Sequence, residues 1–161
     1  MDNQTSPNEN GNPDSRFIEK VGQHFESEGM SRIGGRILGY LLLQKDPRSL
    51  DEIADALHVS KASISSNTRF LEGYGLLERV TLPGDRRDYY ELGGDMHKRL
   101  LERRVKWLRG TVQLLSDGCC TEHGRDPLVQ ARLAGMKQFF AHMIEAIAAI
   151  QERWNRSPGE V

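Results

Sequence analysis

The chain has 161 residues, of which 37% are hydrophobic and 28% charged, and its formal net charge is −1. This length suffices for one domain or a small pair of domains. No apolar run approaches the ~18 residues that cross a bilayer, so we expect no membrane span, and the near-neutral charge argues against indiscriminate nucleic-acid binding without excluding a local basic surface.

Residues 1–13 are rich in Asn, Pro and Gly, which predicts a disordered arm. Apolar residues at helical spacing then predict a helix over residues 14–29, ended by Gly29. Ser31 is a suitable N-cap for a second helix, which Pro47 ends. Three glycines weaken this second helix by about 1 kcal/mol each relative to alanine, so we expect another helix to pack closely against them: Gly34, Gly35 and Gly39.

Residues 49–92 predict the order helix, turn, helix, hairpin. Ser49 and Glu52 have the spacing of a capping box, which begins a short helix whose inward residues are Ile53, Ala54 and Leu57. Ser60 caps the next helix, which runs from Lys61 to about Tyr74 and ends at Gly75 in the left-handed conformation. Two strands, 76–80 and 88–92, follow, and Pro83-Gly84 forms the turn between them.

The second helix of this unit has a small, hydroxylated outer face. With Ile64, Thr68 and Leu71 inward, the outward and flanking residues are Ala62, Ser63, Ser65, Ser66, Arg69 and Gly73, and no acidic residue occurs over 60–71. Such a face can enter the major groove of DNA, where hydroxyls bond to bases or phosphates and Arg69 reaches a guanine edge. Lys61 and the capped N-terminus, including Ser60, would meet phosphate. A merely solvated serine-rich helix is the alternative.

The tip of the hairpin carries Asp85, Arg86, Arg87 and Asp88. Arginines on such a wing suit the narrow, electronegative minor groove. Ion pairing of these arginines with the neighbouring aspartates is the other interpretation, and both can hold together.

Two long helices complete the chain, the first over residues 96–116. In the second, apolar residues keep a 4-3 alternation, which indicates a helix-helix interface within the chain or between subunits: Val129, Leu133, Met136, Phe140, Met143, Ile147, Ile150 and Trp154. An ordinary amphipathic core helix is the alternative.

Other candidate sites are weaker. The basic stretch 98–109 is a phosphate-contacting flank, part of an anionic-effector pocket or a solvated helix face. Cys119 and Cys120, followed by His123, lack the second half of a zinc pattern, and adjacent cysteines cannot build a disulfide framework. A thiol-based redox sensor using Cys119 and Cys120 stays open. We expect no enzymatic activity, cofactor or metal, and, with no signal peptide evident, a cytoplasmic location.

Five segments together resemble the winged helix-turn-helix of MarR-type regulators, most similarly the GbsR-like branch: residues 34–41, 60–65, 69–72, 75–80 and 83–90. The resemblance covers roughly residues 30–92. It implies a homodimeric bacterial transcription regulator in which 60–69 is the recognition helix and Asp85 and Arg87 match the Asp-x-Arg of the wing. It also implies that the terminal helices form the dimer interface.

The predicted fold is therefore mainly α with a small β-hairpin wing. Its parts are a disordered arm (1–13), an N-terminal dimerisation helix (14–29), a winged helix-turn-helix DNA-binding domain (30–95) and a C-terminal helical dimerisation region (96–156). We expect a homodimeric repressor that binds double-stranded DNA at a palindromic operator and responds to a small molecule or stress. A winged-helix module that binds proteins rather than DNA is the alternative. Residues 60–109 carry a net charge of +4, whereas the rest of the chain carries −5. This distribution favours DNA contact through one basic surface rather than indiscriminate binding.

Overall fold

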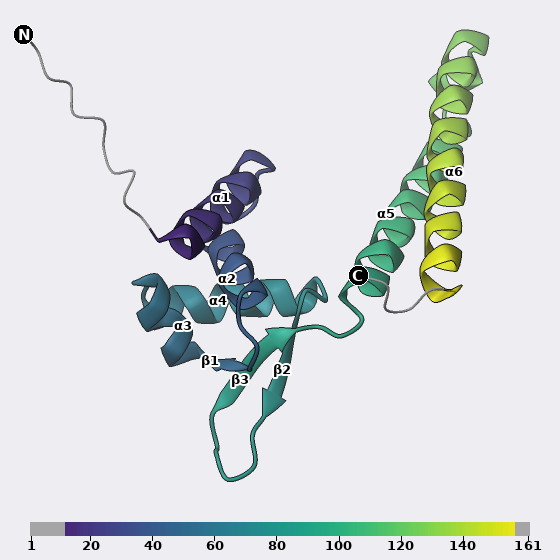
Figure 1. Ribbon diagram of the computed structural model, residues 1–161. Helices are drawn as coiled ribbons and strands as arrows, with labels where there is room; N and C mark the ends of the chain where they lie inside the picture. The colour runs from purple at the N-terminus through teal and green to yellow at the C-terminus, as the bar shows by residue number, and fades with distance from the viewer. Residues whose placement is uncertain (1–11, 157–161) are drawn as a thin grey trace, which may run out of the picture. The chain divides into compact units, whose positions relative to one another are not determined.

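The computed structural model describes residues 12–156, so all but the end of the predicted arm at 1–13 lies outside the described residues. The described chain confirms the predicted fold class: it is mainly helical, with six α-helices and a small three-stranded antiparallel sheet (Figure 1). It divides into two compact units, one ending at Met96 and one beginning at His97.

The first unit begins with two closely packed helices, α1 (Pro13–Ser27) and α2 (Arg32–Leu42). Their backbones touch at the predicted glycines: a Cβ added to Gly35 would lie 2.7 Å from the Val21 carbonyl oxygen and 2.8 Å from the Gly22 Cα. A Cβ added to Gly39 would lie 3.2 Å from the Ile18 Cα. The expectation that a helix packs closely is confirmed for Gly35 and Gly39, where that helix is α1, whereas a Cβ added to Gly34 would instead lie 3.3 Å from Asn67 Oδ1.

Both helices are capped by side chains, and their ends differ slightly from prediction. The Asn12 side chain accepts a hydrogen bond from the Asp14 N–H, so α1 begins one residue earlier than expected. Ser31 caps α2 as predicted. The expectation that Pro47 ends α2 is wrong, because the chain already turns at Leu43 and the following residues lead into a strand.

Two further helices, α3 (Leu50–Leu57) and α4 (Lys61–Gly73), form the predicted helix-turn-helix. Both halves of the Ser49 and Glu52 capping box are present. His58 joins the helices in the left-handed conformation with φ +52°, and Gly75, at φ +75°, follows the end of α4. Ile53, Ala54 and Leu57 are buried, as expected.

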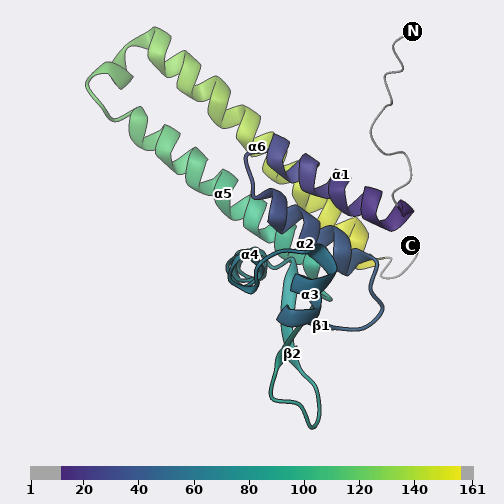
Figure 2. The ribbon, with the colours of Figure 1, turned by 90° about the vertical axis from the view of Figure 1, so that its left-hand side faces the viewer.

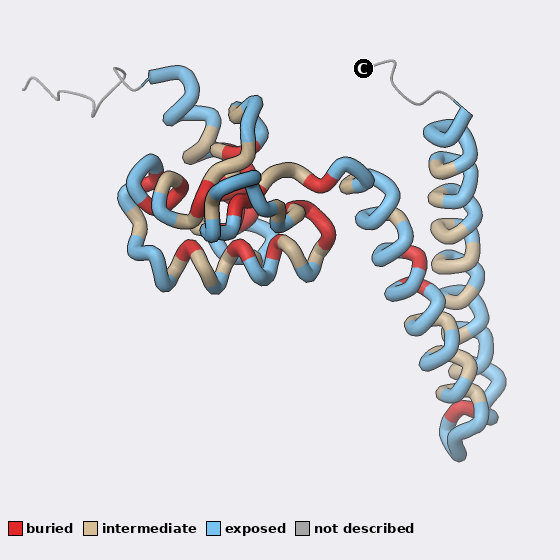
Figure 3. Tube along the Cα trace, turned by 90° about the horizontal axis from the view of Figure 1, so that it is seen from below, coloured by how far each residue is buried: buried red, intermediate tan, exposed pale blue. Residues whose placement is uncertain are grey.

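The sheet contains β1 (Arg48–Ser49), β2 (Leu77–Thr81) and β3 (Asp88–Leu92) in the order β1-β3-β2. The β2–β3 hairpin turns at Pro83-Gly84, where Gly84 has φ +82° and the Asp85 N–H donates to the Leu82 carbonyl. Strand β1, which pairs Ser49 with Tyr89, is not predicted from the sequence. The core of the unit lies between the helices and this sheet, where the buried segments of the chain gather (Figure 3). Its fully buried side chains include Ile37, Ile53, Ile64, Leu71 and Leu77.

The second unit is a helical hairpin of α5 (Met96–Gly118) and α6 (Pro127–Arg156), joined by a turn that contains the short 3₁₀ helix η1 (His123–Arg125). The helices lie side by side in both views (Figures 1 and 2). Trp107 packs edge-on against Phe140 with ring centroids 6.2 Å apart, and His97 packs against Trp154 at 4.5 Å. Val105 and Leu108 of α5 are buried, whereas no residue of α6 is.

Candidate nucleic-acid interface

Helix α4 presents the face that its sequence predicts. Ile64, Thr68 and Leu71 are fully buried against the core. On the opposite side, Ser63 and Ser65 are half-buried. The other residues of this side are exposed: Ser60, Lys61, Ala62, Ser66, Arg69 and Gly73. The structure thus brings all the predicted recognition-helix residues onto the solvent side of one helix.

Two of the hydroxyl groups on this face, those of Ser60 and Ser66, already donate hydrogen bonds to neighbouring residues. Ser66 Oγ donates to the Ala62 carbonyl at 3.0 Å, and Ser60 Oγ donates to Ser63 Oγ at 2.9 Å while it accepts from the Ser63 N–H. A hydroxyl that donates its proton keeps acceptor capacity. These serines can therefore accept from the amino groups of adenine or cytosine, which project into the major groove.

Arg69 is exposed and lies along the helix toward its N-terminus. One terminal nitrogen, Nη2, donates to Ser65 Oγ at 3.0 Å. The remaining guanidinium N–H groups make no hydrogen bond to a described residue, so they are available for a bidentate contact of the kind that guanine accepts.

Lys61, at the start of α4, already has an acidic partner. Its Nζ lies 2.7 Å from Asp51 Oδ1 of α3, and both side chains are more than half exposed. An exposed pair of this kind is worth roughly 0–1 kcal/mol. A phosphate can therefore replace Asp51 as the partner of Lys61 at a small energetic cost, and the sequence does not predict the contact with Asp51.

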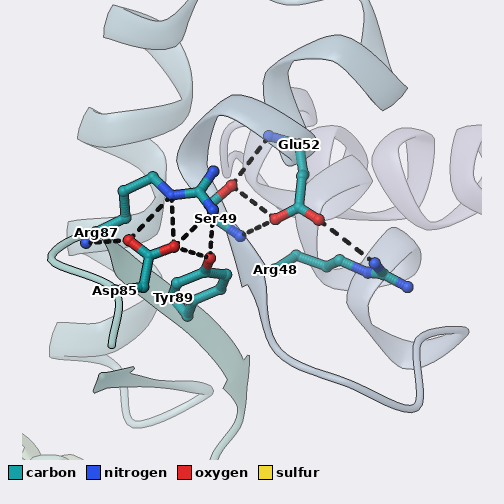
Figure 4. Close-up of polar contacts among 6 residues, drawn as sticks. All are labelled: Arg48, Ser49, Glu52, Asp85, Arg87 and Tyr89. Atoms are coloured by element: carbon teal, nitrogen blue, oxygen red, sulfur yellow. Dashed lines mark hydrogen bonds and ion pairs between the residues drawn. The ribbon is translucent and has the colours of Figure 1, made fainter. Parts of the chain in front are cut away.

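The wing holds Arg87 in a set of contacts that we call the wing clamp, formed by Asp85, Arg87 and Tyr89 (Figure 4). The Arg87 side chain donates to Asp85 from Nε and Nη2, at 3.0 and 2.6 Å to Oδ2, and its backbone N–H donates to Asp85 Oδ1 at 2.9 Å. Arg87 Nη2 also donates to the Tyr89 hydroxyl at 2.6 Å, and that hydroxyl donates to Asp85 Oδ2 at 2.8 Å.

These contacts shift the pKa values of all three groups. The Arg87 guanidinium holds the pKa of Asp85 well below its ordinary value, and the Asp85 carboxylate raises the pKa of Arg87. Donation to Asp85 raises the pKa of Tyr89, because losing the proton would end that bond. Near neutral pH, Asp85 is therefore ionised while Arg87 and Tyr89 keep their protons, which is the combination that these hydrogen bonds require.

The predicted ion pairing in the wing is confirmed for Arg87, but the two aspartates differ in partner. Asp88 pairs with Arg79 across the hairpin, at 3.3 Å. Arg86 is exposed and makes no ion pair or hydrogen bond with any residue in the described part of the chain. The wing thus offers one fixed arginine and one that is free to reorient.

The wing clamp lies next to the capping box of α3, a neighbour that sequence analysis missed. Ser49 is the strand partner of Tyr89, and its hydroxyl donates to Glu52 Oε2 at 2.6 Å while its N–H donates to the same oxygen at 2.8 Å. These bonds from Ser49 lower the pKa of Glu52. Strand β1 joins the wing clamp to the capping box of α3. With two residues, it is too short to show the alternating apolar pattern that predicts a strand.

The eight predicted dimerisation residues all lie on α6, but their exposure differs. Val129, Leu133, Phe140, Met143 and Ile147 are half-buried, whereas Met136, Ile150 and Trp154 are exposed. Further apolar side chains outside this set are exposed on the same hairpin: Leu100, Trp107 and Leu114 on α5, and Leu128 and Phe139 on α6. Leu100, Trp107 and Leu114 of α5 are spaced seven residues apart, and this spacing is the sequence signal that predicts their common side of the helix.

The two cysteines lie outside the unit that carries α4 and the wing. Cys119 is half-buried and Cys120 exposed in the turn after α5, and both are free thiols. No group of three His, Cys, Asp or Glu side chains between residues 12 and 156 is placed to hold a metal ion. None of the helices described is long and apolar enough to cross a membrane.

Known proteins resemble this chain both in sequence and in fold. The model of the MarR family matches residues 28–88. The chain is 31% identical over 145 residues to the HTH-type transcriptional regulator MmpR5 of Mycobacterium tuberculosis, covering 89% of this chain and 88% of that protein. It is 28% identical over 85 residues to the HTH-type transcriptional repressor OpcR of Bacillus subtilis, which is 53% of this chain and 46% of the relative. A crystal structure of a transcriptional regulator superposes with a TM-score of 0.81 at 29% identity, covering 91% of this chain and all of that one.

Proposed function

The chain belongs to the MarR family of winged helix-turn-helix transcriptional regulators and is not an enzyme, and from this premise we propose that it binds a palindromic DNA operator as a homodimer. The observation that carries the proposal is the outer face of α4. It exposes small hydroxylated residues and Arg69, it lacks acidic groups over 60–71, and its unit also carries a wing with two arginines.

Each part of this surface suits one part of the duplex. Helix α4 enters the major groove, where Ser63, Ser66 and Arg69 contact base edges. The wing contributes Asp85, Arg86 and Arg87 at the adjacent minor groove, whose negative potential attracts arginine. Two subunits would place their α4 helices about one helical turn apart, ~34 Å, so that a palindrome is read by two-fold symmetry.

The exposed apolar side chains of the helical hairpin support the homodimer. We call them the apolar hairpin face: Leu100, Trp107, Leu114, Leu128, Met136, Phe139, Ile150 and Trp154. The contact of Trp107 with Phe140, which also packs against Phe139, brings the rows of α5 and α6 together. Exposed apolar side chains that gather on one part of a protein mark an interface, and a second copy offers the same residues by symmetry.

The regulator is proposed to act as a cytoplasmic repressor that responds to a small molecule or stress and belongs to the GbsR-like branch. The similarity to OpcR, which is named as a repressor, supports repression, and the segment 34–41 supports the branch. An effector would release DNA only through different affinities for the DNA-binding state and the released state.

Selection of bound fragments from the source genome, followed by salt titration, tests the proposal. Because DNA binding through phosphates releases counterions, the affinity for a selected fragment should fall steeply as salt rises. Absence of any bound fragment, or an affinity that salt leaves unchanged, would contradict the proposal and favour a winged-helix module that binds proteins. The genes that neighbour the selected fragments would also indicate the effector.

A further inference from the structure

The wing clamp contains Tyr89, whose contact with Arg87 and Asp85 is not evident from the sequence. Tyr89 is nearly buried, at 6% exposure, although its neighbours Arg87 and Asp88 are exposed. Burial of the ring fixes the place of the hydroxyl, because β3 pairs on one side with Val80 of β2 and on the other with Ser49 of β1. The hydroxyl is thus mounted on a rigid strand rather than on the tip of the hairpin.

This hydroxyl bonds to both members of the Arg87 and Asp85 pair. It accepts from Arg87 Nη2 at 2.6 Å and donates to Asp85 Oδ2 at 2.8 Å, and the guanidinium carbon lies 5.3 Å from the centre of the Tyr89 ring. An exposed arginine and aspartate two residues apart would ordinarily sample many rotamers. Here the third partner restricts both side chains at once, while Arg87 Nη1 makes no hydrogen bond to any residue between 12 and 156.

We infer that Tyr89 is a positioning residue for DNA recognition: its hydroxyl holds Arg87 in one orientation before DNA arrives, so that the wing arginine enters the minor groove already ordered. The inference rests on the proposed DNA-binding function. Ordering a long side chain in advance removes an entropy loss from the binding step. Tyr89 therefore acts through Arg87, and the wing's preference for a narrow, A·T-rich minor groove depends on the hydroxyl.

The neighbouring residue supplies a matched control for the test. Tyr90 lies on the same strand and is buried to a similar degree, at 4% exposure. Its hydroxyl makes no hydrogen bond to any residue in the described range. Tyr89→Phe and Tyr90→Phe thus each remove one oxygen from a buried ring of the same strand, but only the first removes a contact to Arg87.

DNA affinity is measured on a selected fragment with an A·T-rich flank and on one whose flank is G·C-rich. Tyr89→Phe should weaken binding to the A·T-rich fragment about two- to tenfold and reduce the preference between flanks, while Tyr90→Phe changes neither. In an Arg87→Ala background, the further effect of Tyr89→Phe should stay below about twofold, because residues that act as one unit are not additive. Thermal unfolding of each variant checks that the fold is kept.

Nuclear magnetic resonance of the full chain without DNA tests the ordering directly. The Nε–H of Arg87 keeps Asp85 as its partner in every variant, so the order of the side chain is the readout: the order parameter of this N–H should be high in the wild type and in Tyr90→Phe, and lower in Tyr89→Phe. Equal losses of affinity with and without Arg87, or no loss in Tyr89→Phe, would overturn the positioning role. A wild-type protein that binds no fragment would instead contradict the proposed function itself.

Discussion

At the scale of single residues, two of the arginines at the proposed interface, Arg69 and Arg87, differ in how firmly the protein holds them. Arg87 is bound by Asp85 and Tyr89, whereas Arg69 makes one hydrogen bond, to Ser65. A side chain with few internal partners keeps its donors for recognition. Arg69 is therefore expected to read a base, and Arg87 to read the shape of the groove.

Replacing Arg69 by alanine should cost about 1–3 kcal/mol of DNA-binding free energy and relax the preference at one base position of the operator. The reason is that a bidentate contact to guanine distinguishes it from the other three bases. Binding to a library of operator variants measures the change. Equal losses on all sequences would make Arg69 a phosphate contact instead.

The sequence predicts Arg69 well and the wing clamp only in part. Helical periodicity with Ile64 inward suffices to place Arg69 outward, because a helix has one repeat along its whole length. The pairing of Asp85 with Arg87 is likewise local. The role of Tyr89 is not, because its burial depends on β1, a strand of two residues from a distant part of the chain.

At the scale of elements, caps and close backbone contacts determine where the helices begin and how they pack. The capping box at Ser49 and Glu52 was predictable because it depends only on spacing within four residues. The end of α2 at Leu42 was not, because neither glycine nor proline marks the C-cap residue Leu43.

Removing the Ser49 side chain in Ser49→Ala should lower the free energy of unfolding by about 1 kcal/mol, the usual effect of losing an N-cap. Ser49 is 1% exposed, so water cannot replace the lost hydroxyl easily. Chemical denaturation measures the change. Ser27→Ala, on an exposed residue at the end of α1, serves as the comparison and should have a smaller effect.

The same cap makes stability depend on pH. The bonds from Ser49 lower the pKa of Glu52 in the folded protein below its ordinary value of 4.5, so the unfolded chain takes up this proton first as pH falls. The stabilisation is therefore complete above about pH 5 and is lost progressively as pH falls through the lowered pKa. Unfolding of Glu52→Gln followed over this range should show a weaker acid dependence than the wild type; an unchanged profile would contradict this.

Gly35→Ala should destabilise the first unit by about 1–3 kcal/mol, because the added methyl group meets the backbone of α1. Gly110→Ala is the matched control in an exposed helical position where a Cβ meets nothing within 4 Å, and it should stabilise by roughly 0.5–1 kcal/mol. Denaturation midpoints of the two variants should thus move in opposite directions. A shift in the same direction would show that helix propensity outweighs the contact between α1 and α2.

At the scale of the whole molecule, the helical hairpin leaves much of its apolar surface uncovered in a single chain. The predicted seam on α6 is divided: residues such as Phe140 face α5, while Met136 and Ile150 are exposed. Periodicity alone could not separate these two roles, since a 4-3 repeat serves a partner helix in the same chain and one in another subunit equally well.

Phe139→Glu should weaken association of the proposed dimer by about thirtyfold or more, as expected when an interface anchor worth ~2 kcal/mol is replaced by a charge. Phe139 is 57% exposed in the single chain, so the substitution should leave the fold of the monomer intact. Sedimentation equilibrium measures the dissociation constant. Gln138→Glu, an exposed neighbour on the polar side of α6, should leave it unchanged; equal effects of both would argue against this face as the interface.

The turn between α5 and α6 also determines where a thiol-reactive label attaches to this protein. Both cysteines of the chain lie there, and Cys120 is exposed. A Cys119→Ser variant would therefore accept one spin label or fluorophore at one known position, without any cysteine having to be introduced. In a dimer the two labels would form a single pair, and the distance between them would report how the hairpin tips separate when operator DNA or an effector is added.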